Sequence, residues 1–342
     1  MEPAARKQKI LSAIVESFIK NGEPVGSKSL IAEAGLKVSS ATVRNDMAEL
    51  TDRGYLVQPH TSAGRIPTEK GYRYYVDRVV KVTPVSQQGR EYIREALARG
   101  ADSPESILQC AANTLARLTD CIALATTPSG DDVRIRKISF VPTGAHTALA
   151  VVMASNGVIK TKLFRCEFLL TPEILQVFDK AFNETFTAIP LKSVTRPFIQ
   201  TAAAGYGELS LFMTAPLTAI FEAAEQAAQI NVCHSGFGKL MNVTGASLAG
   251  AHRVWEFLQN KHDLAVMLER LPQATAATIG TENSRIELSQ SAVISTRYTV
   301  SGAASGVLAV IAPMRTDYAR TMSILNCIAE CADAQIGELI EQ

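Results

Sequence analysis

Apolar residues in the first part of the chain recur every three or four positions, which is the period of a helix that buries one stripe. This spacing is found over residues 4–21, 28–34 and 39–53. Ser27 is placed to cap the second of these helices, and Ser39 or Ser40 to cap the third, because a serine hydroxyl can accept a hydrogen bond from a free backbone N–H. The pattern therefore predicts three helices joined by tight turns.

A hairpin and a fourth helix are predicted next. Residues 55–58 and 65–67 have the character of short strands, and the segment between them, PHTSAG, is rich in turn-forming residues. Thr68 is then placed to cap another helix. Helices followed by such a hairpin, the wing, are typical of a winged helix-turn-helix, which we expect to occupy residues 1–82.

The rest of the chain alternates between helical and strand patterns. Helical periodicity predicts helices over residues 90–100, 104–120, 172–186, 201–211, 216–229, 251–271 and 317–340. Strands are predicted over residues 135–142, 147–154, 158–164, 230–234, 274–280, 292–300 and 306–312, with a hairpin turn at residues 155–157. This order indicates an α+β protein in which a sensor-type domain carries an insertion.

The outward face of the third helix is suited to reading DNA bases. Its inward stripe consists of Val43, Met47 and Leu50, and its opposite face of Ala41, Arg44, Asn45 and Ala48. In the major groove an arginine such as Arg44 can form a bidentate contact with guanine, and Asn45 can pair with adenine. Ala41 or Ala48 allows close approach or contact with a thymine methyl group. Taken alone, Arg44 is equally well explained as a solvated surface arginine.

A second set of polar residues is placed to contact the DNA backbone. Near the starts of the second and third helices, where backbone N–H groups point at anions, these are Ser27, Lys28, Ser39, Ser40 and Thr42. On the wing, which can reach the backbone or the minor groove, they are His60, Thr61, Ser62 and Arg65. Helix caps, a polar outer face and a wing in one segment therefore predict DNA binding.

Charge is unevenly distributed along the chain. The net charge is +1, but residues 1–81 hold 13 Lys and Arg against 9 Asp and Glu, a net +4, and the remainder carries a net −3. The hydrophobic content of 47% is that of a folded globular protein. Neither a signal peptide nor a membrane span is evident, so we expect a cytoplasmic protein that makes no membrane contact. A basic DNA-binding domain joined to a slightly acidic regulatory part fits this distribution of charge.

The residues give no indication of an enzyme, a cofactor or a metal site. The segment Gly236-Phe237-Gly238 lacks the third glycine of a dinucleotide site, and His252 and Glu256, four residues apart, are better explained as a surface pair than as metal ligands. The tyrosines Tyr72, Tyr74 and Tyr75 are expected to be core residues rather than a base-stacking platform, and the six cysteines to be buried free thiols. We therefore expect no catalytic residue, no cofactor and no metal.

Several segments resemble one known family, the heat-inducible HrcA repressors. PVGSKSL, SSATVRNDMAEL and QPHTSAGRIPTEKGYRYYVD are similar to the N-terminal signature of that family, and IGTEN near Gly280 and PMRTDYAR at residues 313–320 resemble further family blocks. The likeness extends over nearly the whole chain. It is weakest over residues 230–247, and Asn283-Ser284 stands where the family has a proline.

The resemblance implies a winged-helix reader, a GAF-like domain and a dimerising domain inserted into it. The implied boundaries are 83–104 for a linking helix, 105–169 and 251–342 for the GAF-like domain, and 170–250 for the inserted domain. It further implies a homodimer that binds an inverted-repeat operator in double-stranded DNA upstream of chaperonin operons, with its activity supported by the GroEL chaperonin. Protein symmetry would then match operator symmetry.

Two other functions remain open from the sequence. One is a winged-helix repressor controlled by a small metabolite bound in the C-terminal domain, although no glycine-rich phosphate loop follows residue 130. The other is an enzyme with a DNA-binding appendage, for which the chain lacks a recognisable catalytic constellation.

Overall fold

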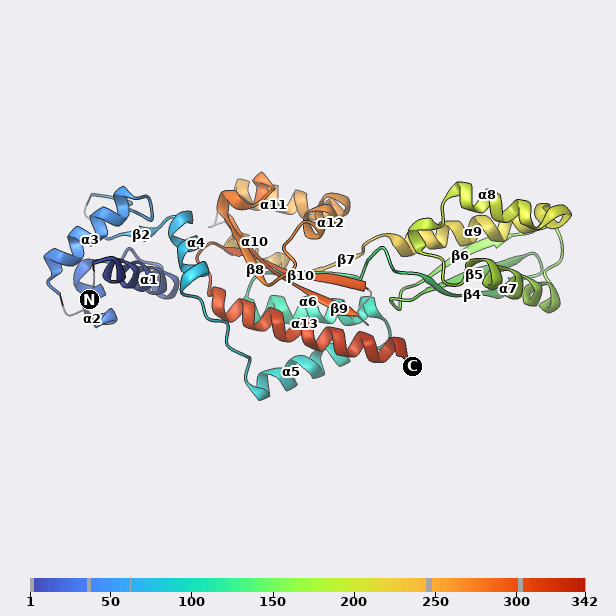
Figure 1. Cartoon of the computed structure of the whole chain (residues 1–342), viewed down its shortest axis with the longest axis horizontal. Coiled ribbons are helices and arrows are strands. Elements are labelled where there is room, and N and C mark those ends of the chain that lie inside the picture. The colour runs from blue at the N-terminus through green and yellow to red at the C-terminus, as the bar shows by residue number, and fades with distance from the viewer. Residues whose placement is uncertain (1–2, 36–37, 62, 244–247, 301–303, 342) are drawn as a thin grey trace.

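The computed structural model describes residues 3–35, 38–61, 63–243, 248–300 and 304–341. Its elements form three groups along the long axis of the molecule (Figure 1). We name them the reader (residues 1–82), the insert (residues 128–230) and the body (residues 83–127 and 231–342). The reader and the insert lie at opposite ends, with the body between them.

The reader has the helices and the hairpin that the sequence predicts. They are α1 (Pro3–Asn21), α2 (Ser27–Ala34), α3 (Ser40–Asp52), β1 (Leu56–Val57), β2 (Ile66–Pro67) and α4 (Glu69–Arg78). Ser39 caps α3 by accepting from the N–H of Thr42, and Thr68 caps α4 by accepting from the N–H of Gly71. The prediction that Ser27 caps α2 is wrong. Gly26 precedes α2 without a side-chain cap, because the Ser27 hydroxyl is instead hydrogen-bonded to that of Ser40 at 2.9 Å.

The body is a five-stranded antiparallel sheet with helices on both faces (Figure 1). In sheet order, its strands are β7 (Val232–Ser235), β3 (Ile122–Thr126), β10 (Ala304–Pro313), β9 (Ser291–Val300) and β8 (Ala276–Ile279). The helices on one side are α5 (Gln87–Ala98), α6 (Pro104–Thr119) and α13 (Tyr318–Glu341). Those on the other are α10 (Leu240–Val243), α11 (Leu248–Gln259) and α12 (Lys261–Glu269).

Successive residues of a body strand enter different cores. On β3, Ala123 and Ala125 belong to the core shared with α6 and α13, whereas Ile122 and Leu124 belong to the core shared with α11 and α12. A strand buried on both faces has a continuous apolar sequence instead of an alternating one. For this reason the apolar pattern of residues 122–126 does not by itself predict a strand at β3.

The insert has a separate sheet and a separate core. Its elements are β4 (Ile135–Gly144), β5 (Thr147–Ala154), β6 (Ile159–Arg165), α7 (Pro172–Phe186), α8 (Arg196–Gly205) and α9 (Ser210–Ala228). The strands pair in the order β4-β5-β6, with α7 packed on β4 and α9 on β5 and β6. At the centre, the rings of Phe140 and Phe182 lie 5.6 Å apart between their centroids, and Phe178 contacts both.

The strand pairing differs from the domain boundaries that we expected. We placed residues 105–169 in one domain with residues 251–342 and began the inserted domain at residue 170. In the structure β4–β6 pair with one another and not with the body sheet, so the insert leaves the body after β3 and returns at β7. An alternating strand pattern shows that one face is buried, but it carries no information about which sheet the strand joins.

Two further features concern the chain as a whole. Within the ranges listed above, no helix is long and apolar enough to cross a membrane. The cysteines are free thiols, of which Cys121, Cys166, Cys327 and Cys331 are buried, and burial raises the pKa of Cys121 to about 11.

Candidate nucleic-acid interface

The outer face of α3 is exposed, as its periodicity predicts. Ala41, Arg44, Asn45 and Ala48 are all exposed, whereas Val43, Met47 and Leu50 are buried in the reader core. Among the described residues, neither the Arg44 guanidinium nor the Asn45 amide has a side-chain partner, so both are available to a ligand. The combination of two long hydrogen-bonding side chains and two small ones gives a surface that can approach the edges of bases.

Two ion pairs hold the other side of α3 against α1. Arg6 donates to Asp46 at 2.6 Å, and Lys7 donates to Glu49. Asp46 is 5% exposed, and burial of a carboxylate is tolerated when it is paired and hydrogen-bonded. Each pair joins a carboxylate of α3 to a basic residue in the N-terminal half of α1. Together the two pairs fix the rotation of α3 about its axis, and therefore the direction in which Arg44 points.

The pair between Lys7 and Glu49 has a defined pH dependence. The hydrogen bond from Lys7 lowers the pKa of Glu49 below its ordinary value of 4.5. A carboxyl group whose pKa is lowered by folding stabilises the fold above its unfolded pKa, and this contribution is lost as the pH falls through its folded pKa. The contact between α1 and α3 is therefore complete at neutral pH and weakens in acid.

Hydroxyl groups gather at the start of α3. The Ser39 hydroxyl is hydrogen-bonded to that of Thr42 at 2.9 Å, and Ser27 is bonded to Ser40 across the turn between α2 and α3. Lys28 is exposed on the first turn of α2. The expected backbone-contact residues of the two helices thus lie together, and three of the four hydroxyl residues are half-buried rather than fully exposed.

The wing is tied to both neighbouring segments of the reader. Arg65 exchanges two backbone hydrogen bonds of 2.9 Å with Val25, and its side-chain Nε donates to the Thr51 hydroxyl at 3.0 Å. His60 and Thr61 are exposed at the tip, and Ser62 lies outside the described residues. Arg65 is therefore half-buried and partly engaged within the protein, while the tip remains open to a ligand.

The residues that hold α3 in place are not among those predicted from the sequence. Arg6, Lys7, Asp46 and Glu49 were not singled out, although one signal was present. Asp46 is a charged residue beside Met47 on the inward side of a helix, a position at which an unpaired carboxylate would be costly. A buried charge of this kind predicts a basic partner on the neighbouring helix.

The tyrosines and the other candidate sites lie elsewhere. Tyr72 is buried and packs against Tyr318 of the body, and Tyr74 meets Tyr55 edge to face at 5.8 Å, so the prediction of core packing is confirmed. His252 and Glu256 lie 3.5 Å apart, both more than half exposed, on α11. No group of three potential metal ligands was found in the described part of the chain.

Comparisons with known proteins identify the family of this chain. A family model described as HrcA protein C terminal domain matches residues 105–322. Heat-inducible transcription repressor HrcA from Laribacter hongkongensis is 31% identical over 336 residues, covering 97% of this chain and 95% of that protein. The HrcA repressor of Bifidobacterium longum strain DJO10A is 32% identical, covering 98% of each chain. These matches place the chain in the class of transcription repressors. It belongs to the HrcA family.

One solved structure is similar over the full length. A protein described as hypothetical superposes with a TM-score of 0.65 and 23% identity, covering 98% of each chain. At this identity the likeness concerns the fold alone.

We predict that Asp46→Ala will loosen α3. Removing the carboxylate leaves the half-buried Arg6 guanidinium without its partner, so the free energy of opening of the α3 amides should fall by about 1–3 kcal/mol in hydrogen exchange. The control is Asp52→Ala, because Asp52 is exposed at the end of the same helix. This variant should change the free energy of opening by no more than about 0.5 kcal/mol. Equal protection of α3 in both variants would contradict the role of Asp46.

Proposed function

We propose that this protein is a sequence-specific DNA-binding repressor of heat-shock operons, with the reader acting as a winged helix-turn-helix. The observation that carries this proposal is the outer face of α3, where Arg44 and Asn45 stand exposed between two alanines while Asp46 anchors the helix from behind. Membership in the HrcA family supports it. The chain acts by binding and not by catalysis.

In this proposal α3 lies in the major groove. Arg44 donates two hydrogen bonds to a guanine, Asn45 pairs with an adenine, and Ala41 contacts the groove floor. The hydroxyls of Ser27, Ser39, Ser40 and Thr42 and the Lys28 ammonium group approach phosphate oxygens. On the wing, His60, Thr61 and Arg65 contact the DNA backbone or the minor groove. Ser62, which lies outside the described residues, is expected to make the same kind of contact.

We predict that Arg44→Ala will weaken operator binding by about 1–3 kcal/mol and relax the base preference at one position in each half-site. The matched variant is Arg65→Ala, which should weaken binding to the operator and to random DNA alike, because its contacts carry no base information. Titration of both DNAs with both variants separates the two roles. If Arg44→Ala kept the ratio of operator to random affinity, Arg44 would not be a base reader.

The body and the insert supply regulation and dimerisation in our proposal. The body, with helices on both faces of its sheet, is taken as the GAF-like domain, and the insert as the dimerising domain. One face of the insert sheet is covered by α7 and α9, whereas Val141, Leu149 and Leu163 stand next to one another on the other face. Leu163 is 59% exposed, and Leu211 on α9 is 84% exposed. Three apolar side chains next to one another on a sheet face that no described helix covers support an interface with a second copy.

We predict that removing the insert will yield a monomer with an intact body. Thr127 donates its backbone N–H to Asn231 at 2.9 Å, so an Asn-Gly turn can join these two residues in place of residues 128–230. Sedimentation should show one chain, and affinity for a full inverted repeat should fall about 100-fold or more while binding to a half-site is kept. A stable dimer of the shortened chain would show that the insert is not the dimerising domain.

The GroEL chaperonin is proposed to set the fraction of active repressor. A marginally stable body falls into inactive states when about 1–2 kcal/mol of stability is lost, and a chaperonin that returns these states to the native fold would restore operator binding. This part of the proposal rests on the resemblance of the sequence to the HrcA repressors, which implies support by GroEL.

We predict that operator occupancy after mild heating will recover severalfold faster with GroEL and ATP than without them. The control is a panel of sugar phosphates and nucleotides added in place of the chaperonin, which should leave occupancy unchanged. Occupancy that ignored the chaperonin but changed severalfold with one metabolite would establish the alternative, a metabolite-controlled repressor.

A further inference from the structure

The orientation of the reader depends on a small contact region with the body. After α4 ends at Arg78, residues 79–86 are neither helix nor strand, and α5 begins at Gln87 (Figure 1). Such a connection does not fix an angle between two domains. The contacts between the reader and the body must therefore do so, and those of α4 with the edge strand β8 and the segment that follows β8 include directional hydrogen bonds.

Two side chains of α4 reach across to this edge. The Glu69 carboxylate accepts from the backbone N–H of Thr281 at 3.1 Å and from its hydroxyl at 2.6 Å. One turn later, Arg73 donates from Nε to Glu282 at 2.8 Å, forms a second contact with the same carboxylate, and donates to the carbonyl of Ala277 at 2.5 Å. We call these contacts of Glu69 and Arg73 with residues 277–282 the latch.

The backbone of the body is shaped to receive Glu69. Gly280 has a φ of +58°, and a Cβ at this position would lie 2.2 Å from the Glu69 carboxyl carbon. A side chain there would both strain the backbone and displace Glu69. The close approach of the carboxylate to the N–H of Thr281 thus requires glycine at residue 280.

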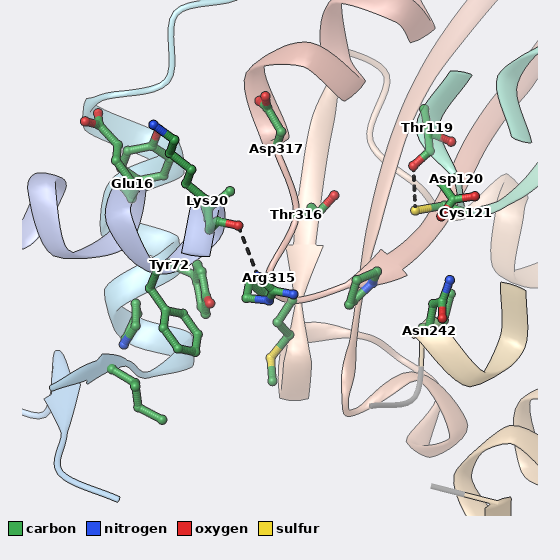
Figure 2. Close-up of a pocket in the computed structure, with 18 of the residues that line it drawn as sticks. Glu16, Lys20, Tyr72, Thr119, Asp120, Cys121, Asn242, Arg315, Thr316 and Asp317 are labelled. Carbon is green, nitrogen blue, oxygen red and sulfur yellow. Dashed lines mark hydrogen bonds between the residues drawn. The ribbon is translucent and has the colours of Figure 1, made fainter. Parts of the chain in front are cut away.

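A second contact lies beside a cleft between the two domains. Arg315, before α13, donates to the carbonyl of Ile19 in α1 at 3.3 Å, and Tyr72 packs against Tyr318. Figure 2 shows Tyr72 and Arg315 on the wall of this cleft, which has a volume of about 1040 Å³ and also borders Asp120. The open space on this side would leave room for the reader to pivot about α4 if the contacts of the latch were removed.

We propose that the latch is a positioning device that fixes the angle of the reader, so that two copies of α3 meet two half-sites at one spacing. This inference rests on the proposed function and adds a structural basis for operator spacing to it. A bidentate contact between arginine and carboxylate constrains direction as well as distance, which apolar packing does not. Glu69 and Arg73 are thus positioning residues and do not touch DNA.

Segments that are far apart in the sequence meet at this place. Glu69 and Arg73 lie in EKGYRYYVD, Thr281 and Glu282 in IGTEN, and Arg315 in PMRTDYAR. None of these segments belongs to the outer face of α3 or to the wing tip. These residues can therefore affect DNA binding only indirectly, by setting the position of α3 relative to the body.

The experiment compares the unmodified chain with the double variant Glu69→Ala and Arg73→Gln, because alanine at position 69 leaves no side-chain acceptor for the N–H of Thr281. Affinity is measured for a single half-site, for the full inverted repeat, and for repeats whose half-sites are moved apart by added base pairs. The double variant should bind the half-site within about twofold of the unmodified chain but the full repeat about tenfold more weakly, because the second reader is no longer held at the required position. It should also lose less affinity than the unmodified chain when the spacing changes.

Two further measurements keep the outcome clear. Arg285→Gln is the matched control, because Arg285 pairs with Asp263 at 2.7 Å at similar exposure but within the body, and it should leave all three affinities unchanged. If the double variant fails to fold, Thr281→Val removes one latch contact and should change the spacing preference in the same direction. An unchanged ratio of full-repeat to half-site affinity and an unchanged spacing preference would overturn the latch.

Hydrogen exchange separates a failure of the latch from a failure of the proposed function. The N–H of Thr281 donates to Glu69, so it should exchange more slowly in the unmodified chain than in the double variant. Equal exchange would overturn the latch whatever DNA binding shows. If the unmodified chain bound no half-site of any sequence while this difference in exchange was present, the proposed function would be wrong and the latch would stand as a contact that orients the reader.

Discussion

Burial of both faces of the five-stranded sheet constrains where every other unit can attach. Leu124 and Ala125 are neighbours in sequence, yet they enter different cores because helices occupy both sides of β3. With the faces covered, further units can join at the edges and ends of the strands. The reader meets the edge strand β8, and the insert leaves from the end of β3 (Figure 1). The extended shape of the molecule follows from this arrangement.

The reader joins the body through two kinds of interaction with different physical roles. Tyr72 and Tyr318 are both buried, and they link the reader core and the body core into one continuous apolar cluster. Apolar burial provides attraction without direction. Arg73 and Glu282 provide direction at the rim of the same contact. A domain that must be held at an angle, and not merely attached, needs the second kind as well as the first.

What the sequence predicted correctly is mainly what local chemistry determines. The serine cap of α3, the threonine cap of α4 and the exposed face that holds Arg44 each depend on residues within one or two helical turns. Ser27 is the instructive exception. By pattern it is an N-cap, but in the structure it bonds to Ser40, a residue of the next helix. A local rule fails where a side chain has a better partner from another element.

What the sequence did not reveal depends on partners far away along the chain. Helical spacing establishes that Glu69 and Arg73 share one face of α4, and it would do so equally if that face met solvent. Arg73 and Glu282 are 209 residues apart, so no window of periodicity includes both. The same limit explains why the strand pattern of the insert did not disclose its partners. Pairing information of this kind belongs to the folded chain, and it is at such contacts, between elements that each look complete by themselves, that the angle between reader and body is determined.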